Sequence, residues 1–228
     1  ACESDGVIYT KANKEIAVAS TKSFLGQVVS LTLLSMVLAQ AKGKMTQKQT
    51  RVFFNELADT AEQIELILED TCAIDRAAHA CCDAQSAFFI GRGMGSAISY
   101  EGALKLKEIS YMHAEAYPAG EMKHGPIALL HDNFPVIAVA TDSPVYDKVI
   151  SNIQESRARG AMIVAIATEG DDNIKKYADH VIYIQKVRDC FSAITASVPL
   201  QLFARSIAVE RGCDVDQPRN LAKSVTVE

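Results

Sequence analysis

The feature that most constrains this chain is a regular alternation of short apolar runs with amphipathic stretches from Ala84 onward. Runs of this kind, about five to eight residues long and separated by helical patterns, are typical of parallel strands buried on both faces. The sequence therefore predicts an α/β fold with a doubly wound parallel sheet flanked by helices. The expected strands are Ser86–Ile90, Ala114–Tyr117, Phe134–Thr141, Met162–Thr168 and His180–Gln185.

The loops after these strands are the first places to look for chemistry, because ligands of such sheets bind outside the carboxyl ends of the strands. The loop Gly91–Ser96 reads GRGMGS, and Ser96 is expected to cap a helix over 96–112. A tight strand-to-helix turn, a place where a sugar or phosphate approaches the backbone, and a partial dinucleotide fingerprint all remain open for this loop. The last interpretation is the weakest, since Ser96 replaces the third glycine.

The N-terminal part of the sequence has a different pattern of apolar and charged residues. Ser23–Ala41 is an uncharged stretch of 19 residues interrupted by glycine and polar side chains. We expect a helix buried inside the protein there, because a membrane-spanning helix needs about 20 mostly apolar residues. Residues 45–70 carry apolar side chains at helical spacing among many charges, which indicates a surface helix or a linking helical pair. A helix over 193–211 is expected near the C-terminus.

Composition excludes some partners. The 228 residues carry a net charge of −5 and no basic block, which argues against nucleic acid and anionic membranes as partners. The 6 cysteines show no CxxC spacing, as expected for reduced thiols in the cytoplasm. The sequence indicates no cofactor and no metal site. The histidines read as structural or solvated are His79, His113, His131 and His180.

One predicted helix carries charges on a single face. Glu101, Lys105 and Glu108 are spaced i, i+4 and i+7, so they share that face. A solvated, salt-bridged stripe is one interpretation. The other is a carboxylate base beside a cation, suited to moving a proton next to a carbonyl. Spacing alone leaves both open.

Two further positions belong to coil segments. His124 lies in a loop next to Gly125-Pro126, where a histidine is better placed for acid–base work than in a core. Lys223 lies in a tail without clear periodicity, where a lysine is ordinarily solvated.

Three long motifs together carry a resemblance to a known family. They are EIAVASTKSF (Glu15–Phe24), EGALKLKEISYMHAEAYPAGEMKHGP (Glu101–Pro126) and DVDQPRNLAKSVTVE (Asp214–Glu228). In this order they resemble the isomerase part of the glucosamine-6-phosphate synthase family, the glutamine–fructose-6-phosphate aminotransferases (isomerising). The resemblance covers essentially the whole chain and implies sugar isomerase (SIS) domains.

The resemblance also implies a division of the chain. Residues 1–44 correspond to the C-terminal remnant of a first SIS domain and 45–71 to a helical linker. Residues 72–212 correspond to a complete second SIS domain and 213–228 to an active-site tail. The family's glutaminase domain and the first half of the first SIS domain, with its phosphate-binding Ser/Thr loop, have no counterpart here. We therefore expect this chain by itself to be inactive or slow.

The same resemblance implies residue roles in converting fructose 6-phosphate and glutamine-derived ammonia to glucosamine 6-phosphate, in hexosamine biosynthesis. Lys223 resembles the lysine that forms a Schiff base with C2 of the open-chain sugar. Glu108 resembles the base that moves a proton between C1 and C2, and Lys105 the cation beside it. His124 resembles the ring-opening residue, which the family supplies from the partner subunit of a homodimer. The sugar-contact loop matches Val18, Ala19 and Ser20.

Three alternatives remain, of which a purely structural or dimerising piece would describe the behaviour of this chain better than the function of the longer protein. Another phosphosugar isomerase or deglycase of the same fold would not need the C-terminal motif. A non-catalytic phosphosugar-binding module would have no use for the Lys, Glu and His set, and its regulators would carry a basic DNA-binding segment that this sequence lacks.

Overall fold

The computed structural model describes residues 3–223, so Ala1, Cys2 and the last part of the expected tail, 224–228, lie outside the described residues. All five expected strands form, and they pair in parallel in the order β2-β1-β3-β4-β5. The α/β prediction with a parallel sheet is confirmed. The strands are β1 (Ser86–Gly91), β2 (His113–Pro118), β3 (Pro135–Ala140), β4 (Met162–Thr168) and β5 (His180–Ile184).

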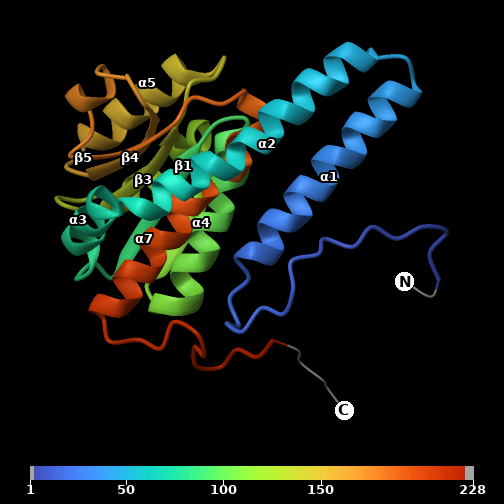
Figure 1. Cartoon of the computed structure of the whole chain (residues 1–228). Coiled ribbons are helices and arrows are strands. Elements are labelled where there is room, and N and C mark those ends of the chain that lie inside the picture. Colours follow the sequence, from blue (N-terminus) through green and yellow to red (C-terminus); the bar gives the residue numbers. More distant parts are fainter. Residues whose placement is uncertain (1–2, 224–228) are drawn as a thin grey trace.

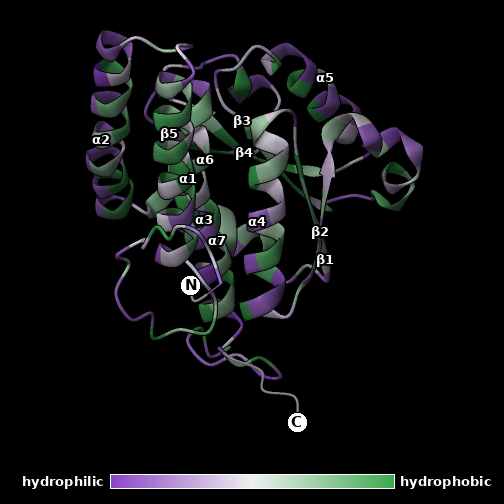
Figure 2. Cartoon of the chain, turned by 90° about the vertical axis from the view of Figure 1, so that its right-hand side faces the viewer, coloured by the Kyte–Doolittle hydropathy of each residue, from purple (hydrophilic) through white to green (hydrophobic). Residues whose placement is uncertain are grey.

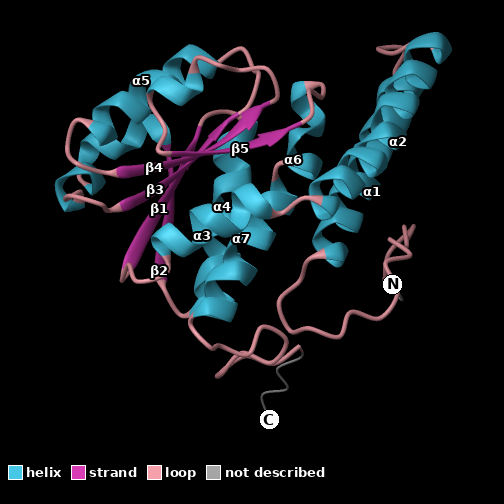
Figure 3. Cartoon of the chain, turned by 60° about the vertical axis from the view of Figure 1, so that its left-hand side comes forward, coloured by secondary structure: helices cyan, strands magenta, loops and turns pink. Residues whose placement is uncertain are grey.

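Helices cover both faces of this sheet (Figure 3). On one face lie α3 (Cys72–Cys81), α4 (Met94–Ser110) and α7 (Ser197–Glu210). On the other lie α5 (Tyr146–Arg157) and the short helix η1 (Ala119–His124). The remaining short helices are η2 (Pro126–Leu129), η3 (Ile174–Lys176), η4 (Asp189–Phe191) and α6 (Ser192–Thr195).

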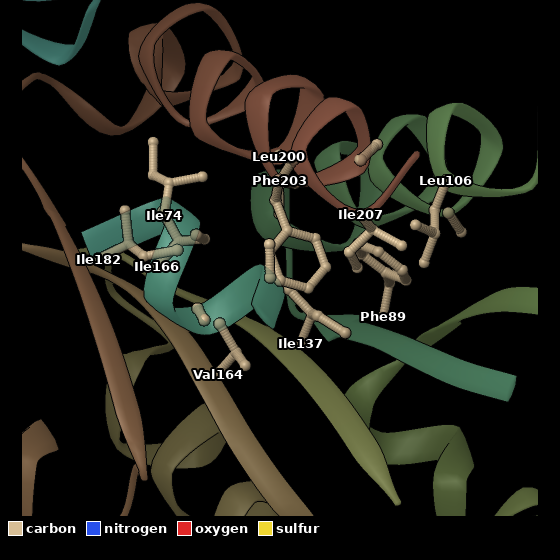
Figure 4. Close-up of a cluster of buried hydrophobic side chains, with 14 of the residues drawn as sticks. Ile74, Phe89, Leu106, Ile137, Val164, Ile166, Ile182, Leu200, Phe203 and Ile207 are labelled. Atoms are coloured by element: carbon tan, nitrogen blue, oxygen red, sulfur yellow. The ribbon is translucent and has the colours of Figure 1, made fainter. Parts of the chain in front are cut away.

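Neighbouring residues of one strand feed two separate cores, because successive side chains in a strand point to opposite faces. Phe89 packs on the α3, α4 and α7 side, whereas Phe88 packs on the α5 side. On the first side, Phe203 and Leu200 of α7 meet the sheet with no exposed surface (Figure 4). This explains why the strand sequences are apolar throughout.

The expected helices are present with two corrections. The helix after β1 begins at Met94, with Gly93 and not Ser96 at the cap position. The expected helix over 193–211 is divided at Ala196 into α6 and α7. Pro199 has no N–H to donate to the carbonyl of Thr195, one turn earlier, so the hydrogen-bond ladder is interrupted there.

The N-terminal arm consists of α1 (Lys22–Ala41) and α2 (Gln47–Glu69), an antiparallel pair that reaches away from the sheet (Figure 1). Residues 45–70 thus form one amphipathic helix, with polar and apolar residues interleaved along it (Figure 2). Thr46 and Gln49 form a capping box at its start.

The expectation that Ser23–Ala41 is a buried helix is wrong for the described residues. Met36 is the one buried residue of α1, whereas Leu31 is 63% exposed and Val37 60% exposed. The reason is that α1 packs through one side onto α2 and α6, while its sequence is apolar on all sides. The N-terminal segment approaches α1 at Gly26, but among residues 3–223 nothing buries Leu31 or Val37.

By length and composition, two stretches could cross a membrane: α1 and Asp189–Glu210. The second is 67% buried within the fold and forms part of its core, whereas α1 is 6% buried.

Candidate functional site

The charged face of α4 is enclosed by protein. Lys105 is 3% exposed and Glu101 is 8% exposed, so the solvated-stripe interpretation is wrong. The Lys105 Nζ lies 2.6 Å from Oε2 of Glu108 and 3.9 Å from Oε1 of Glu101. One buried cation is therefore shared by two carboxylates, and the shorter contact is a charge-assisted hydrogen bond.

Close packing of α4 between the sheet and α7 causes this burial. Gly102 lies where an added Cβ would come within 2.8 Å of the Phe89 ring and 2.9 Å of Leu200. Only a glycine lets β1 and α7 approach α4 this closely. As a result, α7 covers the charged face, and the Gln201 side chain donates a hydrogen bond of 3.2 Å to Oε1 of Glu101.

Two opposing effects set the proton affinity of Glu101. Desolvation raises the pKa of Glu101, while Lys105 and the hydrogen bond from Gln201 act to lower it, and the net shift is upward. A proton therefore binds this carboxyl more readily than it binds a surface glutamate. Glu108 is more accessible, with 22% of its side chain exposed. The site thus places a partly open carboxylate beside a buried cation.

A cavity of about 380 Å³ opens at this cluster. Lys105 and Gln201 line one side, the N-terminal loop contributes Ala17 and Ala19, and the tail contributes Asp216. Lys22 and Arg205 also line it, so three cationic side chains surround this cavity. Lys105 is already paired with Glu101 and Glu108. Lys22 and Arg205 are therefore the cations left to meet an anionic ligand, in a lining that also holds Asp216 and several apolar side chains.

The predicted sugar-contact loop borders this cavity through Ala19, which is 6% exposed. The Val18 N–H donates to the carbonyl of Asp216 at 2.9 Å, which ties the loop to the tail. The Ser20 hydroxyl donates to Oε2 of Glu15 at 3.4 Å. The three predicted residues therefore lie in one short, hydrogen-bonded loop.

Lys223 reaches the same loop from the other end of the chain. Its Nζ donates to the carbonyl of Ala17 at 2.6 Å and lies 3.3 Å from Oε2 of Glu15. Partial burial alone would raise the pKa of Glu15, but hydrogen bonds from Ser23, Thr21 and Lys223 outweigh it and lower the pKa to about 2. Glu15 is therefore an anion over the ordinary pH range and anchors both the loop and the lysine.

The tail before Lys223 runs below the C-terminal end of α4 (Figure 1). The Arg219 N–H donates to the Tyr111 hydroxyl at 2.8 Å, and the Arg219 guanidinium lies 4.2 Å from the centre of the Tyr111 ring. Tyr111 itself caps α4 in the left-handed conformation. Lys223 keeps 45% of its side chain exposed, as expected for a tail lysine, while its Nζ also bonds to the N-terminal loop at Ala17.

His124 lies elsewhere. It ends η1, after the carboxyl end of β2, with 74% of its side chain exposed and its Nε2 3.9 Å from Glu121. It does not line the cavity at Lys105. Within residues 3–223, the structure brings together Lys105, Glu108, the loop at Val18–Ser20 and Lys223, and leaves His124 apart.

The candidate catalytic residues of α4 do not lie at the carboxyl edge of the sheet, where ligands of such folds are expected to bind. Lys105 and Glu108 lie in the last two turns of α4, away from the Gly91–Ser96 turn where this helix begins. In that turn an added Cβ on Gly91 would lie 2.3 Å from the carbonyl carbon of Gly95. Close backbone packing explains these glycines, which favours the tight-turn interpretation.

Sequence reasoning missed Gln201 and Arg205, which follow a helical pattern with no chemical signature of their own. It also missed that His79 and Cys82 meet Glu210 at the surface, with their ligand atoms within 4.8 Å of one another. The i, i+3 spacing of His79 and Cys82 was the available signal.

Comparison with known proteins identifies the family to which this chain belongs. A profile of the SIS domain family matches residues 82–211, more than half of the chain. The chain belongs to the SIS domain family. Over 226 residues it is 48% identical to a glutamine–fructose-6-phosphate aminotransferase (isomerising) of Thermus thermophilus, covering 99% of this chain and 37% of that protein. The corresponding protein of Leifsonia xyli is 48% identical over 230 residues, with the same coverage.

Among solved structures, the chain is similar to the C-terminal domain of the glucosamine–fructose-6-phosphate aminotransferase of Francisella tularensis. The TM-score is 0.89 at 38% identity, covering 95% of this chain and 61% of the other. The SIS chain thus spans about 37% of the length of the curated relatives it matches, all of it within their isomerase part.

Proposed function

We propose that this SIS chain carries the isomerase site of a glutamine–fructose-6-phosphate aminotransferase, which converts fructose 6-phosphate and ammonia to glucosamine 6-phosphate. The observation that carries the proposal is the enclosed set Glu101, Lys105 and Glu108, beside a cavity closed by the loop and tail. Lys22 and Arg205 in the lining of this cavity are the cations available to a sugar phosphate. The relatives named above support the choice of reaction.

In this proposal, Lys223 attacks the C2 ketone of the open-chain sugar, and the ketone oxygen leaves as water. Its position at the mouth of the loop, against the Ala17 carbonyl, brings the amine to the edge of the cavity. Ammonia then displaces the lysine. A side chain on a surface coil segment can approach and withdraw without disturbing the core.

Glu108 then moves a proton between C1 and C2 of the imine. It is the more accessible of the two carboxylates beside Lys105, and its partner Lys105 lines the cavity, which supports giving this role to Glu108. Lys105 stabilises the negative charge that develops on the neighbouring oxygen. Glu101, which accepts a hydrogen bond from Gln201, lies 3.9 Å from the Lys105 ammonium and is the second acidic group beside it.

His124 completes the site from a second copy of the chain and opens the sugar ring. The proposal rests on its separation from the Lys105 cavity and its exposure at the surface. A homodimer would deliver the imidazole across the interface. The proposed compartment is the cytoplasm, in keeping with the free thiols of Cys72, Cys81, Cys82, Cys190 and Cys213.

The remaining parts of the longer protein include the glutaminase domain and the first half of a first SIS domain. In this division, 1–44 ends the first SIS domain, 45–71 links, 72–212 is the second and 213–228 is the tail. The outer apolar face of α1 then packs on the rest of the first domain, which explains why Leu31 and Val37 are exposed here.

The test is the rate of glucosamine 6-phosphate formation from fructose 6-phosphate and ammonia by the complete protein. Glu108→Gln should lower kcat by roughly 10²–10⁴-fold, the usual contribution of a positioned acid–base group. Glu62→Gln, on the exposed side of α2, is the matched control and should retain the rate. An undiminished rate in Glu108→Gln contradicts the proposal. Conversion of fructose 6-phosphate that needs no ammonia would instead identify a phosphosugar isomerase.

A further inference from the structure

A second group of reactive side chains lies where α3 and α7 end side by side. His79 lies in the last turn of α3, Cys82 follows that helix directly, and Glu210 is the last residue of α7. The His79 Nδ1 lies 3.0 Å from Oε2 of Glu210. One ligand atom from each of the three residues lies within 4.8 Å of the other two.

The spacing of these atoms suits a tetrahedral metal ion. Zinc binds sulfur at about 2.3 Å and nitrogen or oxygen at about 2.0–2.2 Å, so two of its ligands in a tetrahedron are roughly 3.3–3.8 Å apart. The observed separations, from 3.0 Å up to a limit of 4.8 Å, bracket this range. The three ligand atoms therefore already lie close to the spacing that one ion requires.

The donor types narrow the choice of metal. A thiolate with an imidazole selects zinc and similar transition metals, whereas magnesium and calcium prefer oxygen ligands alone. His79 and Cys82 are three residues apart at a helix end, so they present their ligand atoms on one side. Three protein ligands leave a fourth position for water.

The backbone that carries these ligands is held in place without a metal. Arg211, which follows Glu210 in the sequence, donates from its Nε to the carbonyl of Cys82 at 2.7 Å. The Ser206 hydroxyl of α7 donates to Asp75 of α3 at 2.7 Å, and Ile74 and Ile207 pack in the same core. The two helix ends are therefore fixed relative to each other before any ion binds.

We propose that His79, Cys82 and Glu210 form a binding site for one zinc ion, separate from the sugar site. The three residues line none of the cavity at Lys105. The ion would join the end of α3 to the end of α7, at the point where the chain turns into the tail that leads to Lys223. This inference does not depend on the proposed aminotransferase function.

The test is titration of the complete, reduced protein with Co²⁺, which replaces zinc and reports its ligands by absorption. Binding should be saturable and should produce a thiolate-to-cobalt charge-transfer band that one equivalent of Zn²⁺ abolishes. In Cys82→Ser this band should disappear. His79→Ala and Glu210→Ala should each weaken Co²⁺ binding by about tenfold or more, because each removes one of three ligands.

Cys72→Ser is the matched control, since Cys72 is an exposed cysteine at the other end of α3. It should leave the band unchanged, and circular dichroism should show that every variant is folded. The proposal is overturned if no saturable band forms, or if the band of the wild-type protein persists in Cys82→Ser. A band lost equally in Cys72→Ser would also overturn it.

Discussion

The charged side chains on one face of helix α4 are buried, whereas apolar side chains of helix α1 are exposed to solvent. Lys105 and Glu101 of α4 are buried, and Leu31 and Val37 of α1 are more than half exposed. Both arrangements are unfavourable by themselves, since buried charges must be desolvated and exposed apolar surface orders water. On α4 the cost is offset within the chain by opposite charges and by Gln201. On α1, no contact among residues 3–223 buries Leu31 or Val37, so the cost of their exposure is not offset there.

The comparison separates two kinds of functional signal. A buried, mutually compensated charge cluster indicates chemistry, because a hydrophobic replacement of the same volume would often be more stable. An exposed apolar face indicates a packing partner, because such contiguous surfaces are uncommon on isolated proteins. In this SIS chain, α4 therefore points to a site and α1 to an interface.

The largest stability effect is expected from breaking the charge cluster on α4. Lys105→Met removes the cation and leaves Glu101 and Glu108 without their partner, which should lower the free energy of unfolding by roughly 3–5 kcal/mol. Lys107→Met, on the exposed side of the same helix, is the matched control and should change it by less than about 0.5 kcal/mol. Urea denaturation of both variants measures the difference. Equal effects would mean that the cluster is not an isolated, compensated set.

A pair of identical substitutions sharpens the contrast between the two helices. Leu106 of α4 is fully buried, so Leu106→Ala should cost about 2–5 kcal/mol through lost contacts and a residual cavity. Leu31→Ala on α1 should change the free energy of unfolding by less than about 0.5 kcal/mol in this chain. In the complete protein, the same α1 variant should cost more if a preceding segment covers this face. Equal cost in both settings would contradict the proposed packing of α1.

The sheet and its flanking helices were predictable from the sequence because their signals are local. Runs such as Met162–Thr168 are continuous and apolar, which specifies a buried strand without reference to any other segment. The division of the last helix at Ala196 has an equally local signal in the sequence, since Pro199 removes one N–H donor.

The candidate site was predictable only in part, because burial and long-range contacts are properties of the fold. The spacing of Glu101, Lys105 and Glu108 is the same whether that face meets water or α7, so periodicity alone could not decide between the two. The contact of Lys223 with Ala17 joins two coil segments 206 residues apart, and coil segments carry no periodic signal. The family resemblance supplied these roles, and the geometry supplied the enclosure.

The most direct test of the central claim is to trap the proposed Schiff base at Lys223. The complete protein is incubated with fructose 6-phosphate, reduced with borohydride and mapped by peptide mass spectrometry. Attack of the Lys223 amine on C2 forms a C=N bond with loss of water, and hydride then fixes the sugar as a stable secondary amine. We predict a saturable adduct on Lys223 that is absent from Lys223→Arg. An adduct on Lys105 or another lysine, or none at saturating sugar, would contradict the account.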